Sequence, residues 1–445
     1  MSDYMFMLES HLSAEQNRVV AEVQAVAQAT VGLFLTGGAM RDMLGGFAVR
    51  DLDFTVEGNA LKLAKAVVET TGAQVAATDD HRKSVELVFP GGVTAEIRMA
   101  RQERYAKPGA KPQISPATIH EDLCGRDFTV DAIALSLNRA SRGLLIDPTN
   151  GLADLGHKEL RAVYNYALYD DPARILRLIR LRVRLGFTVE ERTAQQYANV
   201  RAEQLENRIP AHRLLEELHH FAGDSNPAEV LRVLEEEKLL HLFSPALAAP
   251  KLNLAGLAKL HKSRQLIPFG IPFPLENFGL FLHFLTEKLT PKEKAGLIQA
   301  TGMQSSEVAL WEKLESRSKK LERALGASSL RRPSQVYQLL AEAPGEQILF
   351  LLIRSPLRVV QDRIRNYLQK YLPMAQEVTE EEIKAKGGQP GTPKYQKARE
   401  ELIAARLNAR PKRPLPEAPA EPEAPPPADA RNPKRLLARQ EPTRS

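Results

Sequence analysis

Two aspartates separated by one residue are the feature of this sequence best suited to chemistry. Asp51 and Asp53 belong to the run Arg50-Asp51-Leu52-Asp53, and on a β-strand residues two apart project from the same face. Adjacent carboxylates repel each other unless a cation lies between them. Hard oxygen ligands suit Mg²⁺, which completes its shell with water and substrate phosphates. We therefore predict that Asp51 and Asp53 are catalytic metal ligands and that the cofactor is Mg²⁺.

Paired glycines precede these aspartates. Gly37 and Gly38 end a short apolar run and are followed by Arg41. Glycine lets backbone amides approach a ligand closely, and a helix N-terminus attracts anions. We expect Gly37, Gly38 and Arg41 to bind a nucleoside triphosphate. An Asp-x-Asp pair alone is a weak signal because aspartates are common at strand ends, but the glycine pair on a strand–turn–helix–strand frame strengthens it.

A third carboxylate is expected from a neighbouring strand. Glu96 lies in the alternating segment 93–99 (VTAEIRM), which is typical of a strand. We predict Glu96 as a further catalytic residue. The alternative is that Glu96 merely alternates outward on an amphipathic strand.

The elements up to about residue 165 mix strands and helices around one small sheet. Residues 11–29 have helical periodicity, with Ser13 as the N-cap. Residues 101–120 are polar, contain three prolines and predict a mobile, functional loop. The other expected elements are strands at 31–38, 52–58 and 144–148, a hairpin at 84–99, helices at 59–72 and 127–139, and a short helix running into a strand at 151–163.

Strand signals vanish beyond residue 166, and the following segments carry helical periodicity. We predict an α+β fold: a small head with a mixed sheet, followed by an all-helical neck, body and tail. The last segment contains ten prolines and almost no apolar residues, so we expect it to be disordered. The expected divisions are 1–165 for the head, 166–220 for the neck, 221–409 for body and tail, and 410–445 for the Pro-rich tail.

Composition excludes several classes of protein. The chain has 445 residues, of which 43% are hydrophobic, and no apolar run approaches the length of a membrane span. Cys124 is the single cysteine, which excludes a disulfide framework and a Cys-rich zinc module. We expect a cytoplasmic protein without a membrane partner. The net charge of +6 is compatible with a polyanionic partner.

Several ordered motifs resemble a known family. The run GGAMRDMLG followed by RDLDF resembles the signature of the class II tRNA nucleotidyltransferase/poly(A) polymerase family, within the polymerase-β-like superfamily. Residues 126–132 (RDFTVDA) resemble the family's RRDFTINA motif, which is linked to ribose recognition, so Arg126 and Asp127 are implied to bind the nucleotide. Gly125 replaces the first arginine of that motif, and Asp131 replaces its asparagine.

Two further motifs follow in the family's order. Residues 147–155 (DPTNGLADL) resemble its DPxGGxxDL segment, which helps to couple head and neck movement. Residues 170–177 (DDPARILR) resemble EDPLRxLR, the neck helix that reads the incoming base, with Asp170 in place of the glutamate. The clear resemblance covers roughly residues 30–220.

The residues of this last motif support the same interpretation. Asp171 and Arg174 are three apart and so are neighbours on one helix face. They could form an ordinary surface ion pair, or they could offer an acceptor and a donor to the Watson–Crick edge of a base. With the flanking motifs we favour base selection that accepts cytosine and adenine, with Arg177 also at the nucleotide.

Arginines are dense in residues 170–213, where affinity for RNA phosphates would be electrostatic. Their spacing places them on more than one helix face, so some are expected to be solvated or paired. We predict RNA contacts at Arg180, Arg184 and Arg208.

The resemblance implies a template-independent nucleotidyltransferase that adds CCA to tRNA 3′ ends from CTP and ATP. A-adding, CC-adding and poly(A)-adding enzymes share these motifs, so they remain alternatives. A non-catalytic RNA-binding protein on the same scaffold is a further alternative. Retention of both Asp51 and Asp53 argues against it, since adjacent carboxylates gain nothing by facing RNA phosphates. Nothing in the sequence indicates an oligomeric state.

Overall fold

The computed structural model describes residues 3–27, 32–247, 250–268, 271 and 273–409. The Pro-rich segment 410–445, for which we predict disorder, lies outside the described residues.

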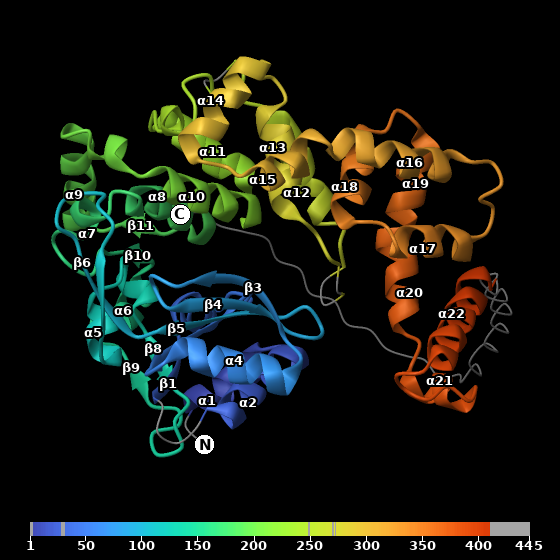
Figure 1. Cartoon of the computed structure of the whole chain (residues 1–445), viewed down its shortest axis with the longest axis horizontal. Helices are drawn as coiled ribbons and strands as arrows, with labels where there is room; N and C mark the ends of the chain where they lie inside the picture. The colour runs from blue at the N-terminus through green and yellow to red at the C-terminus, as the bar shows by residue number, and fades with distance from the viewer. Residues whose placement is uncertain (1–2, 28–31, 248–249, 269–270, 272, 410–445) are drawn as a thin grey trace, which may run out of the picture.

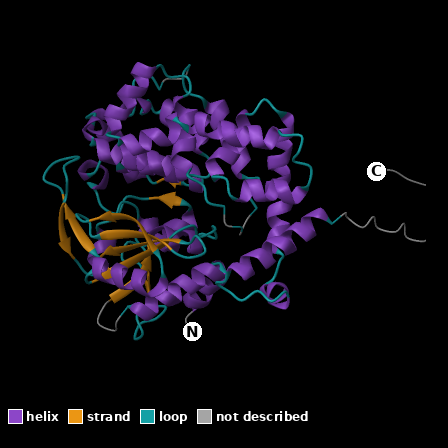
Figure 2. Cartoon of the chain, turned by 45° about the vertical axis from the view of Figure 1, so that its right-hand side comes forward, coloured by secondary structure: helices purple, strands orange, loops and turns teal. Residues whose placement is uncertain are grey.

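A seven-stranded mixed sheet forms the centre of the N-terminal part (Figures 1 and 2). Its order is β3-β4-β5-β2-β1-β8-β9, with β2 and β5 parallel and the other neighbours antiparallel. The strands are β1 (Gly32–Thr36), β2 (Leu52–Glu57), β3 (Gln74–Asp79), β4 (Ser84–Val88), β5 (Thr94–Met99), β8 (Ala134–Ser136) and β9 (Leu145–Ile146).

Helices cover one face of this sheet. Leu52, Phe54 and Val56 alternate along β2 and are fully buried in the main core, which also includes apolar residues of α2 and α4. Asp53 lies between them and therefore projects from the opposite face. The helices of this part are α1 (Asp3–His11), α2 (Ala14–Val26), α3 (Gly37–Leu44), α4 (Ala60–Thr71), α5 (Ile119–Cys124) and α6 (Gly151–His157).

Local capping explains where two of these helices begin and end. Ser13 accepts a hydrogen bond from the amide of Gln16 and forms a capping box with it, as the sequence predicts for the start of α2. Gly72 ends α4 in the left-handed conformation, with φ of 72°. The expected hairpin of β4 and β5 is also present.

Residues 127–139 do not form the expected helix. Thr129–Asp131 form a single 3₁₀ turn, and Ala134–Ser136 form β8 beside β1. Residues 128–137 are all buried, and a short, fully buried apolar run cannot be assigned to helix or strand from periodicity alone. Strand β3 is absent from the sequence prediction because its residues are mostly exposed and show no core-facing alternation.

Residues 101–120 form a β-hairpin rather than an irregular loop. Strands β6 (Arg101–Arg104) and β7 (Gln113–Pro116) pair antiparallel, and α5 begins at Ile119. The turn is fixed to the helical part, since the amide of Gly109 donates to the carbonyl of Asp170 at 3.1 Å. The prolines lie in the turn and at the end of β7, where the ladder does not require their missing N–H.

The rest of the chain is almost entirely helical, as predicted. In Figure 1 it arches from the head through α8 and α10 to the separate α21–α22 end. Two short strands, β10 (Glu159–Leu160) and β11 (Thr188–Val189), pair in parallel near its start. The helices are α7 (Ala167–Asp170), α8 (Arg174–Leu185), α9 (Glu191–Ala202), α10 (Ala211–Gly223), α11 (Pro227–Glu236), α12 (Leu254–Arg264), α13 (Asn277–Thr286), α14 (Pro291–Thr301), α15 (Ser305–Glu312), α16 (Leu314–Gly326), α17 (Pro333–Ala341), α18 (Gly345–Arg354), α19 (Arg358–Asn366), α20 (Leu372–Gln376), α21 (Glu380–Ala385) and α22 (Pro393–Asn408).

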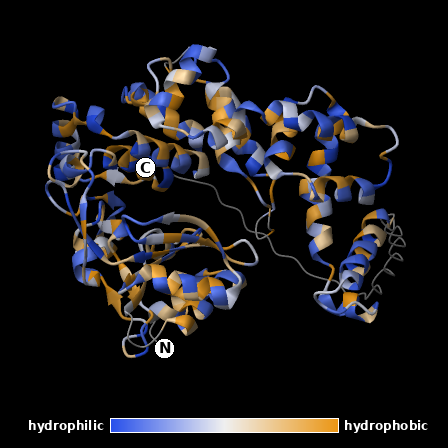
Figure 3. Ribbon diagram, viewed as in Figure 1, coloured by the Kyte–Doolittle hydropathy of each residue, from blue (hydrophilic) through white to orange (hydrophobic). Residues whose placement is uncertain are grey.

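Polar and apolar residues alternate along these helices (Figure 3). Among the described residues, no helix has both the length and the apolar character needed to cross a membrane.

Candidate active site

The predicted carboxylates come together on the face of the sheet opposite to α2 and α4. Strands β2 and β5 run in parallel with Asp53 directly opposite Glu96, so the two side chains share one face. Asp51 precedes β2 by one residue and accepts a short hydrogen bond from Thr94 Oγ1 at the start of β5. The parallel register therefore places Glu96 beside the aspartates, as the sequence analysis expects.

Repulsion within this group perturbs Asp53. Burial and the neighbouring charges of Glu96 and Asp51 raise the pKa of Asp53 to about 7, although Arg98 and Arg126 partly oppose the rise. A divalent cation would relieve this repulsion. The donor set consists of hard carboxylate oxygens, which fits Mg²⁺.

The glycine turn is packed against the same carboxylate. Gly37 has φ of +63°, and a Cβ added there would lie 3.0 Å from Asp53 Oδ2; one at Gly38 would lie 3.3 Å from the same atom. Helix α3 begins at this turn, and the amide of Ala39 donates to Asp53 Oδ2 at 3.4 Å. The positive end of α3 therefore lies directly beside the carboxylates, where it could meet a phosphate.

The side chain of Arg41 does not extend into solvent. Its guanidinium is buried and pairs with Asp42 at 2.9 Å and with Asp131 at 2.6 Å. A Cβ at Gly38 would lie 3.4 Å from Arg41 Nη2, so the positive charge is fixed just behind the glycine turn. Its contribution to a triphosphate would come from this fixed charge.

Arg126 lies beside the glycine turn and is held by hydrogen bonds within the protein. It donates to Asp122 Oδ2 through Nε at 3.0 Å and Nη2 at 2.8 Å, and to the carbonyl of Asp131 at 2.9 Å. Its Nη1 would lie 3.3 Å from a Cβ at Gly37. Arg126 is therefore adjacent to the glycine turn but fully engaged by the protein.

A chain of buried charges joins this region to α8. Arg177 pairs with Asp127 at 2.5 Å and with Asp131 at 2.7 Å, while Asp131 also holds Arg41. The aspartate that departs from the family motif is thus neutralised by two arginines. This pairing connects residues 46 positions apart, and no local sequence signal indicates it.

Asp171 and Arg174 do not share a helix face as predicted, because Asp171 is extended and lies before α8, which begins at Arg174. The two residues lie close together but do not form a tight pair. Arg174 Nε is 4.0 Å from Asp171 Oδ2, and the guanidinium instead donates to the Tyr164 hydroxyl at 3.2 Å and the Gly125 carbonyl at 3.3 Å. Asp171 is paired with Arg213 of α10 at 2.9 Å. The second motif departure, Gly125, therefore contributes a carbonyl to the arginine.

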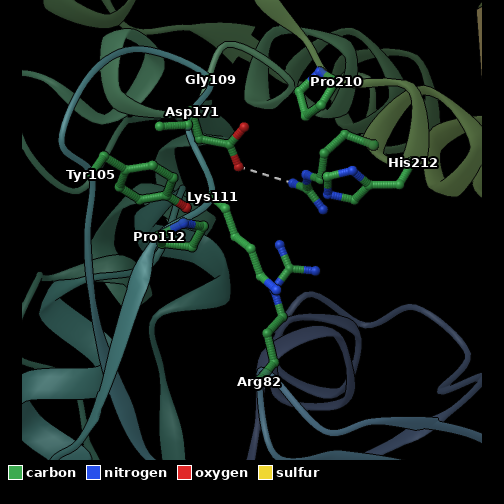
Figure 4. A pocket seen from close by; sticks show the side chains of 10 residues that line it. Arg82, Tyr105, Gly109, Lys111, Pro112, Asp171, Pro210 and His212 are labelled. Carbon is green, nitrogen blue, oxygen red and sulfur yellow. Dashed lines mark hydrogen bonds and ion pairs between the residues drawn. The ribbon is translucent and has the colours of Figure 1, made fainter.

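A pocket opens at Asp171 (Figure 4). Its walls come from the turn before β4, the hairpin turn and the start of α10. Asp171 is the one predicted site residue among its lining residues, which are Arg82, Tyr105, Gly109, Ala110, Lys111, Pro112, Asp171, Pro210, His212 and Arg213.

Two of the three predicted RNA contacts are not presented to solvent. Arg180 is 6% exposed and faces Glu217 and Asp224, and Arg184 pairs with Asp42 at 2.5 Å. The Arg180 pairs lie within the helical part, and the Arg184 pair joins α8 to α3 of the head. The expectation that these two arginines form a phosphate-binding surface is therefore corrected. Arg208 is exposed, next to the hairpin turn.

A second acidic group has little capacity for a cation. Asp154, His157 and Glu159 lie close enough together to be considered. Arg161 donates to Asp154 at 3.0 Å and to Glu159 at 3.3 Å, so a positive charge is already present.

The hairpin turn provides a direct test of the pocket's construction. Gly109 has φ of +70°, and a Cβ there would lie 2.4 Å from the backbone oxygen of Arg208. Gly72 has a similar φ with nothing within 4 Å. Gly72→Ala should cost about 1–2 kcal/mol of unfolding free energy from backbone strain alone. Gly109→Ala should cost more, measured by urea unfolding, because the turn must also move; equal costs would contradict this docking.

Comparison with known proteins supports the same interpretation of the N-terminal part. The poly(A) polymerase head domain matches residues 33–161. The A-adding tRNA nucleotidyltransferase of Aquifex aeolicus is 29% identical over 345 residues, covering 76% of this chain and 40% of the relative. The A-adding enzyme of Halalkalibacterium halodurans is 33% identical over 246 residues, covering 54% and 55%. The chain thus spans about half the length, or less, of these relatives.

The fold is also that of a solved structure. A CCA-adding enzyme in an apo form aligns with a TM-score of 0.52 and 24% identity, covering 93% of this chain and 96% of the other. This likeness extends over the mixed-sheet head and the helical remainder, in agreement with the predicted α+β class. The match of residues 33–161 to the poly(A) polymerase head domain confirms the resemblance that the motifs indicate.

Proposed function

We propose that this protein is a template-independent nucleotidyltransferase that extends tRNA 3′ ends from CTP and ATP. The RNA 3′-oxygen would bond to the α-phosphorus of the nucleotide as pyrophosphate leaves. The observation that carries the proposal is the placement of Asp53 beside Glu96, against the Gly37–Gly38 turn. Those residues would combine ligands for a cation with the positive end of a helix, which favours phosphate.

The carboxylates and the glycine turn would divide the work of the reaction. Asp51 and Asp53 would hold Mg²⁺, with Glu96 adding a third carboxylate. The chemistry supplied by bound Mg²⁺ is activation of the RNA 3′-hydroxyl and neutralisation of charge on the departing pyrophosphate. The amides at the start of α3 would orient the triphosphate, and Arg41 and Arg126 would support that turn by their buried contacts.

Base choice would belong to the pocket at Asp171. A carboxylate accepts hydrogen bonds, so Asp171 suits the exocyclic amino groups of cytosine and adenine. Arg174, whose guanidinium lies close by, would donate to ring acceptors. Uracil and guanine present a carbonyl oxygen at the position where cytosine and adenine carry the amino group. They could not donate a hydrogen bond to Asp171 there and would be disfavoured.

Within this reaction class we favour complete CCA addition. A-only addition is the second candidate, because the A-adding enzymes of Aquifex aeolicus and Halalkalibacterium halodurans are among the relatives of this chain. A CC-adding relative from Deinococcus radiodurans, 34% identical over 203 residues, keeps that product possible as well.

Incorporation of labelled CTP and ATP onto a tRNA transcript in the presence of Mg²⁺ tests the proposal. We expect transfer that chelation of the cation abolishes. Tight binding of the transcript without any incorporation would contradict the proposal and favour the non-catalytic RNA-binding alternative.

A further inference from the structure

The carboxylate that faces the pocket is held by a helix distant in sequence. Asp171 Oδ2 accepts a hydrogen bond from Arg213 Nη2 of α10 at 2.9 Å, marked by the dashed line in Figure 4. Asp171 Oδ1 accepts from the amide of Ala173 at 3.2 Å. Arg174, the first residue of α8, remains 4.0 Å away. The orientation of Asp171 is therefore set mainly by Arg213.

Arg213 is itself restrained. Glu216, one turn further along α10, forms a close ion pair with Arg213. Glu216 also forms an ion pair with Arg82 at 3.4 Å. The Arg213 side chain is 19% exposed, and Asp171 is 8% exposed, so the pair is largely shielded from solvent. A shielded, charge-assisted hydrogen bond is stronger than one at the surface.

This arrangement keeps the carboxylate of Asp171 apart from the guanidinium of Arg174. Arg174 is engaged by the hydroxyl of Tyr164 and the carbonyl of Gly125 rather than by Asp171. A carboxylate and a guanidinium 4.0 Å apart would close into a direct ion pair if nothing competed for the carboxylate. Such a pair would satisfy both groups and leave neither for a base.

We propose that Arg213 is a positioning residue for base selection, which keeps Asp171 apart from Arg174 so that both can meet a nucleotide base. This inference rests on the function proposed above and assigns a role to a residue outside the sequence motifs. Arg213 need not touch the nucleotide; it acts through the carboxylate that does.

The test compares nucleotide kinetics of four proteins. These are the wild type, Arg213→Gln, Arg213→Lys and the control Arg232→Gln, which removes an exposed arginine that pairs with Glu229 on α11. KM and kcat are measured for CTP and ATP on a tRNA transcript, together with incorporation of UTP and GTP. Circular dichroism and urea unfolding report whether each variant folds.

We expect Arg213→Gln to raise KM for CTP and ATP about tenfold, which corresponds to the binding free energy of one charge-assisted hydrogen bond. The value of kcat should change much less. UTP and GTP incorporation should rise relative to CTP and ATP. Arg213→Lys should recover part of the loss because it keeps the charge without the planar fork. Arg232→Gln should behave as wild type.

Three outcomes would overturn the inference. An Arg213→Gln variant with unchanged KM and unchanged base discrimination would contradict it. A rise in KM for the RNA alone would instead make Arg213 a phosphate contact. A wild-type protein that incorporates no nucleotide would overturn the proposed function and this inference together. If Arg213→Gln does not fold, Glu216→Gln gives the same test, because it removes the second restraint and should produce a smaller shift of KM in the same direction.

Discussion

Replacing Asp53 by alanine should reduce nucleotide incorporation roughly a thousandfold, which corresponds to several kcal/mol of transition-state stabilisation. Asp53 lies between Glu96 and Asp51 in the carboxylate group and contacts the Gly37–Gly38 turn. Its loss would remove both a cation ligand and the charge that faces the start of α3. Single-turnover incorporation with saturating nucleotide and Mg²⁺ measures the effect on the chemical step.

The conservative substitution Asp53→Asn should not damage the fold. Burial and neighbouring carboxylates raise the pKa of Asp53 to about 7, above its unfolded value near 4. A raised pKa favours the protonated form, so the stability it contributes is lost as pH rises through about 7. At pH 8 without metal, Asp53→Asn should therefore unfold at no lower urea concentration than the wild type.

A matched control comes from the next strand. Glu86 on β4 lies opposite Glu96 in the antiparallel register, but its side chain is exposed to solvent. Glu86→Gln should retain near-wild-type incorporation. If it were as damaging as Asp53→Ala, or if Asp53→Ala remained active, the assignment of the catalytic carboxylates would be wrong.

Removal of the Asp131 carboxylate should destabilise the protein by about 3 kcal/mol, because Arg41 and Arg177 each lose one of their two carboxylate partners inside the protein. Asp131 is 2% exposed and pairs with Arg41 at 2.6 Å and Arg177 at 2.7 Å. The effect of Asp131→Ala is measured by urea unfolding at neutral pH. Asp131→Asn, which restores the family's residue, should recover part of the loss by keeping a hydrogen-bond acceptor.

Acid titration checks the origin of that effect. Burial alone would raise the pKa of Asp131, but Arg41 and Arg177 hold it well below the ordinary value. A depressed pKa contributes stability above the unfolded value near pH 4 that is lost as pH falls toward the folded value. The unfolding free energy should therefore fall more steeply below pH 4 in the wild type than in Asp131→Asn. Parallel curves would show that the ion pairs contribute little.

The carboxylate group could be predicted because its signals are local. Alternation along two strands puts Asp53 and Glu96 on open faces, and a glycine pair before a helix indicates a phosphate site. What the sequence did not provide was the strand order, yet β2 and β5 had to be neighbours for these two residues to meet. That neighbour relation is assumed, rather than derived from the spacing, when Glu96 is predicted as the third carboxylate.

The charges around this group could not be predicted in the same way. Arg180 and Arg184 have the residue type and density of an RNA-binding surface, but each pairs with an acidic residue brought from elsewhere in the chain. Arg213 meets Asp171 across 42 positions. Arginine content therefore indicates a charged helix face without distinguishing internal pairing from contact with a ligand.

Residues 101–120 show a similar limit. Prolines and polar residues favour an irregular loop, but Arg101 to Arg104 and Gln113 to Pro116 pair with each other, and Gly109 docks on the neck. Pairing of short polar strands depends on tertiary contacts more than on intrinsic preference.

The most direct test of the central claim uses three tRNA transcripts, ending before CCA, after the first C and after CC. Each is incubated with Mg²⁺ and labelled CTP, ATP or both, and the products are resolved at single-nucleotide length. The account predicts two cytosines followed by one adenine on the shortest transcript, with addition then stopping. Addition of adenine to the CC-ended transcript, without any addition of cytosine to the two shorter transcripts, would identify an A-adding enzyme. Absence of any addition to all three ends would contradict nucleotidyl transfer at tRNA 3′ ends.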